Sequence, residues 1–108
     1  MTRRIAVAAA VLAVASSATL ACAQRGAPPP ETGREVFVKQ GCYGCHTIGK
    51  FGTPIGPDLS RVGSKYEEEY LARWLRDPAL QRPTAHMPKL ELTEQEVKAL
   101  AAFLAAQR

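Results

Sequence analysis

The sequence has few cysteines, no internal repeat and no long apolar run. Its 108 residues include three cysteines and one tryptophan. The longest uninterrupted apolar stretch, residues 5–15, is too short to span a bilayer comfortably. A chain of this length makes one small domain. These absences exclude repeat architectures and multidomain enzymes.

The excess of positive over negative charge is also small. The formal net charge is +4, from 14 basic and 10 acidic residues. Two of the basic residues, Arg3 and Arg4, precede the apolar stretch and a run of small residues, which is the layout of a secretory signal peptide. Without residues 1–23 the balance falls to 12 basic and 10 acidic residues. This near-neutral product has no basic, aromatic face, so we expect no nucleic-acid partner.

The N-terminal residues predict export to the periplasm. Ala-Cys-Ala at residues 21–23 fits the small-x-small rule, which predicts a signal peptide over residues 1–23. Residues 19–22 also resemble a bacterial lipobox, with Thr19 in place of the usual leucine, and in that case Cys22 carries a membrane-anchoring lipid. A third alternative keeps the apolar stretch as a short membrane anchor. The proline-rich residues 24–30 predict a stiff tether.

Three segments carry the spacing of amphipathic helices: residues 31–40, 64–76 and 93–108. Glycine and proline dominate residues 47–63, and prolines interrupt residues 79–92. Both connections therefore predict loops rather than strands. We predict an all-α domain over residues 31–108, with about three helices and long loops.

Local signals mark the ends of these helices. Gly41 ends the first helix as a C-terminal glycine. Ser64 and Glu67 fit a capping box at the start of the second helix, and Thr93 and Glu96 fit one at the start of the third. Each box is expected to satisfy backbone N–H groups that a first helical turn leaves without partners.

A domain with such long loops needs a disulfide, a metal or a cofactor for stability, because it has few apolar side chains to form a core. Its only cysteines are Cys42 and Cys45, and its only histidines are His46 and His86. A zinc site needs four such ligands, but Cys45 and His46 are adjacent and no second cysteine pair exists, which disfavours zinc. A redox disulfide is disfavoured because that motif opens a helix after a strand, whereas Gly41 ends a helix.

A third interpretation uses Cys42, Cys45 and His46 together. C-x-x-C-H is the attachment motif of c-type haem. The two thiols add to the haem vinyl groups and form thioethers, and the histidine that follows falls beneath the iron. This interpretation explains why Cys45 and His46 are adjacent, so we predict one covalently bound haem c.

The order of motifs along residues 31–108 resembles that of the class I cytochromes c. The resemblance is greatest to the small single-haem bacterial members and to the cytochrome c domains of oxidase subunits. Five motifs carry it: Gly33 with Phe37, the attachment motif, Gly-Pro-Asp-Leu at 56–59, Met-Pro-Lys-Leu at 87–90, and Leu100 with Phe103. The resemblance implies the cytochrome c fold, an all-α domain wrapped around one covalent haem.

The resemblance also implies how the haem is held. Cys42 and Cys45 are its thioether sites, and His46 and Met87 are its iron ligands. The carbonyl of Pro57 accepts a hydrogen bond from Nδ1 of His46, a contact that aims Nε2 at the iron.

Further roles around the haem follow from the same resemblance. Leu59 packs on the haem. Trp74 donates its Nε1–H to a haem propionate, or alternatively is an ordinary core tryptophan. Gly33 lets the first and last helices cross closely, with Phe37 and Phe103 beside the crossing.

The residues themselves also favour Met87 as a ligand. It is the only methionine besides the initiator, and it precedes Pro88 in a loop, where a gap-filling core methionine is less expected. Two alternatives remain open. Met87 covers apolar surface only, or the neighbouring His86 binds the iron and makes a bis-histidine centre.

One-electron transfer is the function that these residues predict. Two axial ligands leave no open position on the iron, so we expect a monomeric carrier without enzymatic activity. Its partners would be redox proteins such as an oxidase, reductase or dehydrogenase. The resemblance places the exposed haem edge near the attachment motif and the methionine loop, and these segments carry Lys39, Lys50 and Lys89. It therefore implies a basic rim that steers the protein to an acidic partner. The alternatives are a haem-based sensor, in which Met87 leaves the iron, and the haem-carrying part of a membrane oxidase or dehydrogenase complex.

Overall fold

The computed structural model describes residue 10 and residues 30–108. Apart from residue 10, the predicted signal peptide lies outside the described residues, as do Cys22 and the tether up to residue 29. No helix in the described part of the chain is long and apolar enough to cross a membrane.

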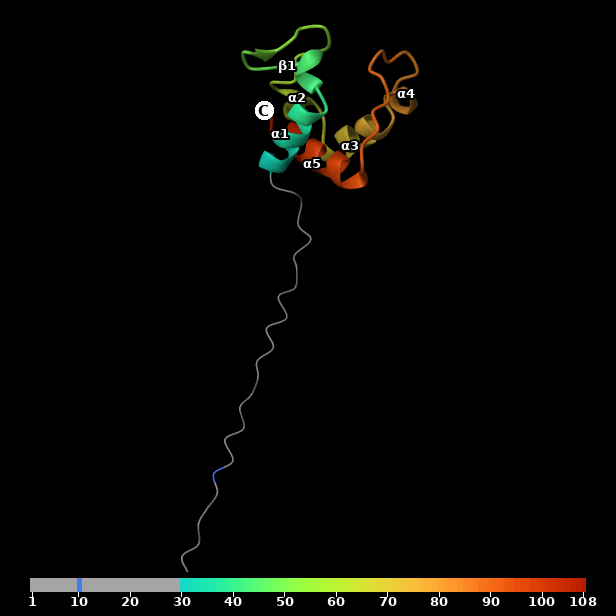
Figure 1. The fold of residues 1–108 in the computed structure, drawn as a ribbon. Coiled ribbons are helices and arrows are strands. Elements are labelled where there is room, and N and C mark those ends of the chain that lie inside the picture. The colour runs from blue at the N-terminus through green and yellow to red at the C-terminus, as the bar shows by residue number, and fades with distance from the viewer. Residues whose placement is uncertain (1–9, 11–29) are drawn as a thin grey trace, which may run out of the picture.

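The described chain is mostly helical, as the sequence predicts (Figure 1). The predicted helices are α1 (Pro30–Lys39), α3 (Glu68–Arg76) and α5 (Glu94–Ala105). The additional elements are shorter: η1 (Cys42–Gly44), β1 (Thr47–Ile48), β2 (Phe51–Gly52), α2 (Val62–Lys65) and α4 (Pro78–Gln81). The hairpin and the α4 segment both rise on the same side of the long helices in Figure 1.

Helices α1 and α5 cross at Gly33, as predicted. A Cβ atom at this position would collide with the carbonyl of Ala99 and with Cβ of Phe103, so only glycine allows the approach. Phe37 is buried beside the crossing, with its ring centroid 5.6 Å from that of Phe103. Its ring also meets the ring of Tyr43 edge-on at 4.7 Å, which connects the helix pair to η1.

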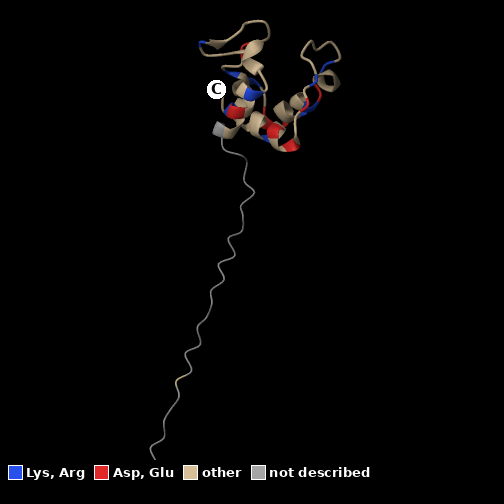
Figure 2. Ribbon diagram, viewed as in Figure 1, with Lys and Arg blue, Asp and Glu red and all other residues tan. Residues whose placement is uncertain are grey.

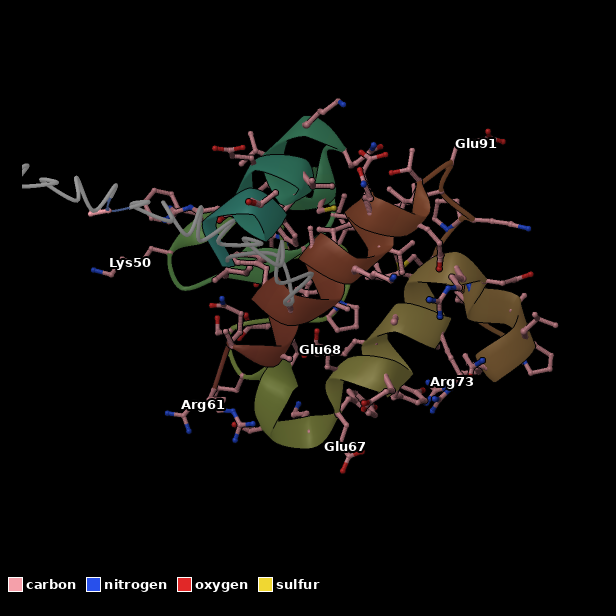
Figure 3. The ribbon with its side chains drawn as sticks, turned by 90° about the horizontal axis from the view of Figure 1, so that it is seen from below. Lys50, Arg61, Glu67, Glu68, Arg73 and Glu91 are labelled. Atoms are coloured by element: carbon pink, nitrogen blue, oxygen red, sulfur yellow. The ribbon has the colours of Figure 1, made fainter. Side chains whose placement is uncertain are left out.

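Helix α5 lies between α1 and α3, so it contributes to both helical interfaces (Figure 3). Leu71 and Leu75 of α3 are buried in one cluster with Val97, Leu100 and Leu104 of α5. Full burial of one such side chain contributes about 1.5–3 kcal/mol to folding. This helix layer is the platform from which the hairpin and the α4 segment extend.

The predicted capping box at the start of α5 is confirmed. The N–H of Glu96 donates to Oγ1 of Thr93, and the N–H of Thr93 donates to Oε1 of Glu96, both at 3.1 Å. The box predicted from Ser64 and Glu67 is wrong. Helix α3 starts later, at Glu68, and Ser64 lies inside the separate helix α2.

A tertiary contact explains why α2 is separate. A Cβ atom on Gly63 would collide with the backbone of Ala105, and the N–H of Gly63 donates to the carbonyl of Gln107 at 2.7 Å. The end of α5 therefore holds residues 62–65 in a turn of their own, and the chain becomes extended at Tyr66 before α3 begins.

The prediction that residues 47–63 contain no strand is also wrong. Strands β1 and β2 pair antiparallel around Gly49 and Lys50. Gly49 has φ of +59°, a conformation that glycine adopts without steric cost. The glycine that suggested an irregular loop is the residue that permits this tight hairpin.

Candidate haem-binding site

The attachment motif follows directly on the end of α1. Gly41 has φ of +73°, and the 3₁₀ turn η1 begins one residue later. The carbonyl of Cys42 accepts hydrogen bonds from the N–H groups of Cys45, at 3.2 Å, and His46, at 2.9 Å. One carbonyl thus holds the three residues of the motif in a compact turn.

Both cysteines of this turn are free thiols in the described structure. Cys42 is partly buried, and burial raises the pKa of its thiol above the ordinary value. Cys45 is exposed. Neither sulfur is consumed by a disulfide, so both are chemically available for the two thioether bonds of haem c.

His46 makes the hydrogen bond that the family resemblance implies. Its Nδ1 lies 2.8 Å from the carbonyl oxygen of Pro57. A carbonyl can only accept, so Nδ1 carries the proton and donates. Nε2 is then the basic nitrogen with a free lone pair, which is the form of the ring that binds a metal.

Gly56 permits this contact, a role that the sequence reasoning missed. A Cβ atom on Gly56 would lie 2.8 Å from Cε1 of His46, so a larger residue would push the loop off the imidazole. The N–H of Gly56 also donates to the carbonyl of Cys45. The only signal in the sequence was the position of this glycine directly before Pro57.

Met87 and Trp74 are brought together from different segments. The Nε1–H of Trp74 donates to Sδ of Met87 at 3.1 Å. Met87 is half-buried against the core, whereas the adjacent His86 is exposed. The two neighbours therefore point into different environments, which favours Met87 over His86 as the residue facing the interior. The indole donates to the sulfur here, and its predicted contact with a haem propionate stays a prediction.

Leu59 is half-buried and packs at the edge of the hydrophobic core. Its N–H donates to the carbonyl of Thr47 at 2.8 Å, which places the loop of residues 56–60 alongside the attachment segment. The predicted contact between Leu59 and the haem stays a prediction.

The zinc alternative gains no support from the geometry. Among residue 10 and residues 30–108, no three side chains of the histidine, cysteine, aspartate and glutamate types gather as a metal site. The available donors are instead two thiols, one oriented imidazole and one thioether. This set fits the thioether bonds and axial ligands of haem c.

The three lysines of the predicted basic rim are all exposed. Nζ of Lys39 lies 4.0 Å from Glu96, and Nζ of Lys89 lies 3.9 Å from Asp77. The two lysine side chains are 76% and 70% exposed, so water screens both pairs. Lys50 occupies the hairpin turn, and its side chain points away from the body of the domain (Figure 3). Figure 2 shows the tip of this hairpin in the colour of a basic residue.

Comparison with known proteins finds relatives that are named as subunits of an oxidase and of a reductase. The sequence is 34% identical over 89 residues to cytochrome c oxidase subunit 2 of Alkalihalophilus pseudofirmus, a match that covers 70% of this chain and 26% of the relative. It is 32% identical over 78 residues to a nitric oxide reductase subunit of Stutzerimonas stutzeri, covering 67% of this chain and 53% of the relative. The chain thus spans only about a quarter to a half of these relatives.

A solved structure supports the fold. The described structure is similar to SoxXA from P. pantotrophus, with a TM-score of 0.67 and 19% sequence identity. The match covers 77% of this chain and 84% of the other.

The family assignment rests on most of the chain. The cytochrome c family profile matches residues 30–107, which is the whole described domain except its last residue. The spacing of Cys42, Cys45 and His46 within that match fits covalent haem attachment. The chain therefore belongs to the cytochrome c family, whose members carry an electron on covalently bound haem c.

Proposed function

We propose that this protein is an exported single-haem electron carrier in which Cys42 and Cys45 hold the haem and His46 and Met87 bind its iron. The observation that carries the proposal is the 2.8 Å hydrogen bond between His46 Nδ1 and the Pro57 carbonyl. It leaves Nε2 as a basic, oriented nitrogen, which a surface histidine without a metal-binding role does not require.

The chemistry of the four side chains supports a carrier rather than an enzyme. When bound, the haem iron supplies a one-electron couple between its ferrous and ferric states. The imidazole of His46 and the thioether of Met87 would both bind the iron, which would leave no place for water or a substrate. A histidine–methionine pair also gives a higher potential than two histidines.

Trp74 supports Met87 in this role. Its Nε1–H reaches the sulfur at 3.1 Å and occupies one lone pair, while the second lone pair stays available for the iron. We therefore propose that the single N–H of Trp74 holds the thioether, as an alternative to the propionate contact that the resemblance implies.

Membership of a larger complex is the second candidate. Relatives with 32–34% identity bear the names of a cytochrome c oxidase subunit and a nitric oxide reductase subunit. The match covers 26% of the first relative and 53% of the second. The chain therefore corresponds at most to the haem-carrying part of each. Electron transfer is the same in both candidates, and only the permanence of the redox partner differs. Purification from native membranes and periplasm distinguishes the two candidates, because a complex subunit copurifies with its redox partner and a separate carrier does not.

The periplasm is the compartment we propose, with a lipid on Cys22 as the alternative link to a membrane. The arginines, apolar stretch and small residues at the start of the sequence support export. Mass spectrometry of the mature N-terminus distinguishes a product that starts after Ala23 from a lipidated product that starts at Cys22.

The test of the whole proposal is covalent haem attachment in protein matured by an exporting host. Wild-type protein should keep its haem through acid-acetone extraction, and Cys42→Ala with Cys45→Ala should lose it completely. Free extraction of haem from the wild-type protein would disprove the attachment. A carbon monoxide complex that forms at once with the wild-type protein would favour the sensor alternative instead.

A further inference from the structure

A side-chain network centred on one carboxylate holds the loop that carries Pro57. Oδ1 of Asp58 accepts hydrogen bonds from Thr47 Oγ1 at 3.1 Å, from the Ser60 N–H at 3.1 Å and from Ser60 Oγ at 2.7 Å. Ser60 Oγ in turn accepts a hydrogen bond from the N–H of Gly49 at 2.7 Å. The carboxylate therefore ties the Pro57 loop to the hairpin that follows the attachment motif.

This network flanks the hydrogen bond between His46 and Pro57. Thr47 directly follows His46, and Asp58 directly follows Pro57. The bond between Thr47 and Asp58 therefore joins the two chain segments that also carry the imidazole and its carbonyl partner. On the other side of the imidazole, the N–H of Gly56 donates to the carbonyl of Cys45. Hydrogen bonds thus join the two segments on both sides of the imidazole, and we call this set of bonds the ladder.

The Asp58 carboxylate is built into the ladder although it is exposed. Hydrogen bonds from Ser60, and further ones from Thr47 with the attraction of Lys65, lower its pKa below the ordinary value. The group is therefore ionised at neutral pH, and hydrogen bonds to an ionised acceptor are about twice as strong as neutral ones. Water could solvate an exposed carboxylate equally well, so burial does not explain why it engages three protein donors.

We propose that Asp58 is a positioning residue for His46, because its carboxylate keeps the Pro57 carbonyl against the imidazole and so sets the orientation of the ring. The inference rests on the proposed function, in which His46 binds the iron. A carbonyl held against Nδ1–H makes a histidine a stronger ligand. Loosening the loop would weaken this ligand, which would stabilise ferric iron less and raise the reduction potential.

The test compares three variants of the haem-loaded protein. Asp58→Ala removes the acceptor, Thr47→Val removes only the cross-loop donor and keeps the branched shape, and Asp58→Asn keeps an acceptor oxygen without the charge. Hydrogen exchange of the His46 Nδ1–H is measured by NMR, and the reduction potential by redox titration. We expect exchange about 10- to 100-fold faster in Asp58→Ala and Thr47→Val, the range for a lost hydrogen bond to a charged group.

The two readouts separate orientation from charge. The potential should rise in both Asp58→Ala and Thr47→Val, and Thr47→Val changes no charge, so its rise reports the ring alone. Asp58→Asn should restore exchange to near the wild-type rate. Glu94→Ala is the matched control, because it removes another exposed carboxylate, one bonded to Arg76, and should leave the exchange rate unchanged.

Two results would overturn the inference. One is a wild-type exchange rate in both Asp58→Ala and Thr47→Val. The other is faster exchange in Asp58→Ala alone, which would reduce Asp58 to a local turn with Ser60. If Asp58→Ala fails to mature, Thr47→Val decides the question by itself. Failure of the proposed function looks different, because His46→Ala would then keep the wild-type visible spectrum.

Discussion

The two sides of the candidate site are held in different ways. On the His46 side, residues 45–60 form a ladder of backbone and side-chain hydrogen bonds that includes the imidazole itself. On the Met87 side, the one polar contact to the sulfur within the described residues is the Trp74 indole at 3.1 Å. The nearby ion pair between Lys89 and Asp77 adds little, because both its length and its exposure weaken it.

The difference predicts which side of the site opens first. Segments with few hydrogen bonds and little buried surface open at a lower free-energy cost than densely bonded ones. A thioether is also a weak hydrogen-bond acceptor, so the contact from Trp74 restrains Met87 only moderately. We therefore expect ligand exchange at the iron to begin with Met87, while His46 stays in place.

The largest expected effect comes from removing Met87, the proposed iron ligand that is held less firmly. Met87→Ala should open one axial position, because alanine has no atom that can bind the iron. Carbon monoxide should bind at once and stoichiometrically, whereas in the wild-type protein it must first displace the sulfur slowly, and the potential should fall as water or His86 replaces sulfur. Visible spectra and redox titration measure both changes.

His86→Ala is the matched control for that substitution. Because His86 is exposed, its loss should leave the spectrum and the potential as in the wild-type protein. An unchanged spectrum in Met87→Ala together with a changed one in His86→Ala would reassign the ligand to His86.

The next largest effect breaks the densely bonded side. Gly56→Ala should lower the free energy of unfolding of the haem-loaded protein by about 1–3 kcal/mol, the usual cost of forcing an extra carbon into a packed site. The added Cβ would lie 2.8 Å from His46 Cε1. Denaturant titration measures the loss. Gly44→Ala is the control within the same region, since a Cβ there meets nothing within 4 Å. Equal stabilities for the two variants would contradict a packed imidazole.

A smaller effect is expected from Trp74→Phe on the Met87 side. Trp74→Phe keeps an aromatic ring but removes the N–H that reaches the sulfur. Loss of one neutral hydrogen bond is worth about 0.5–1.5 kcal/mol, so carbon monoxide should displace Met87 roughly two- to tenfold faster. Stopped-flow spectroscopy measures the rate. Tyr70→Phe is the control, because the Tyr70 ring stacks on Tyr66 rather than on the methionine. A similar rate in both variants would show that the indole does not hold the thioether.

The smallest expected effect comes from the lysines that would face the redox partner. Lys50 lies on the hairpin of the His46 side, and Lys89 lies on the methionine segment. Charge reversal of either lysine to glutamate should slow electron transfer to an acidic partner domain at low ionic strength. The effect should fade at high salt, where the screening length shrinks from about 10 Å at 0.1 M to about 3 Å at 1 M. A rate that is indifferent to salt and to both reversals would favour an apolar contact instead.

Local sequence signals predicted the helical frame. Helices α1, α3 and α5 follow from periodic apolar residues, and the Thr93–Glu96 capping box follows from two residues close in sequence. The crossing at Gly33 and the hydrogen bond from His46 to Pro57 followed from the family resemblance, and both contacts are present.

Contacts between distant residues could not be predicted in this way. The separate helix α2 exists because Gly63 packs on the end of α5, far along the chain. The hydrogen bond from Trp74 to Met87 joins residues 13 positions apart, and the sequence offers no periodicity that relates them. The carboxylate of Asp58 looks like an ordinary loop residue until Thr47 is seen to lie across from it.

X-ray absorption at the iron edge of the purified haem-loaded protein tests the ligand assignment most directly. Histidine–methionine ligation predicts one sulfur and five nitrogen neighbours, and the sulfur should disappear in Met87→Ala while the nitrogen shell of His46 persists. Six nitrogen neighbours in the wild-type protein, or a sulfur signal that survives Met87→Ala, would contradict it.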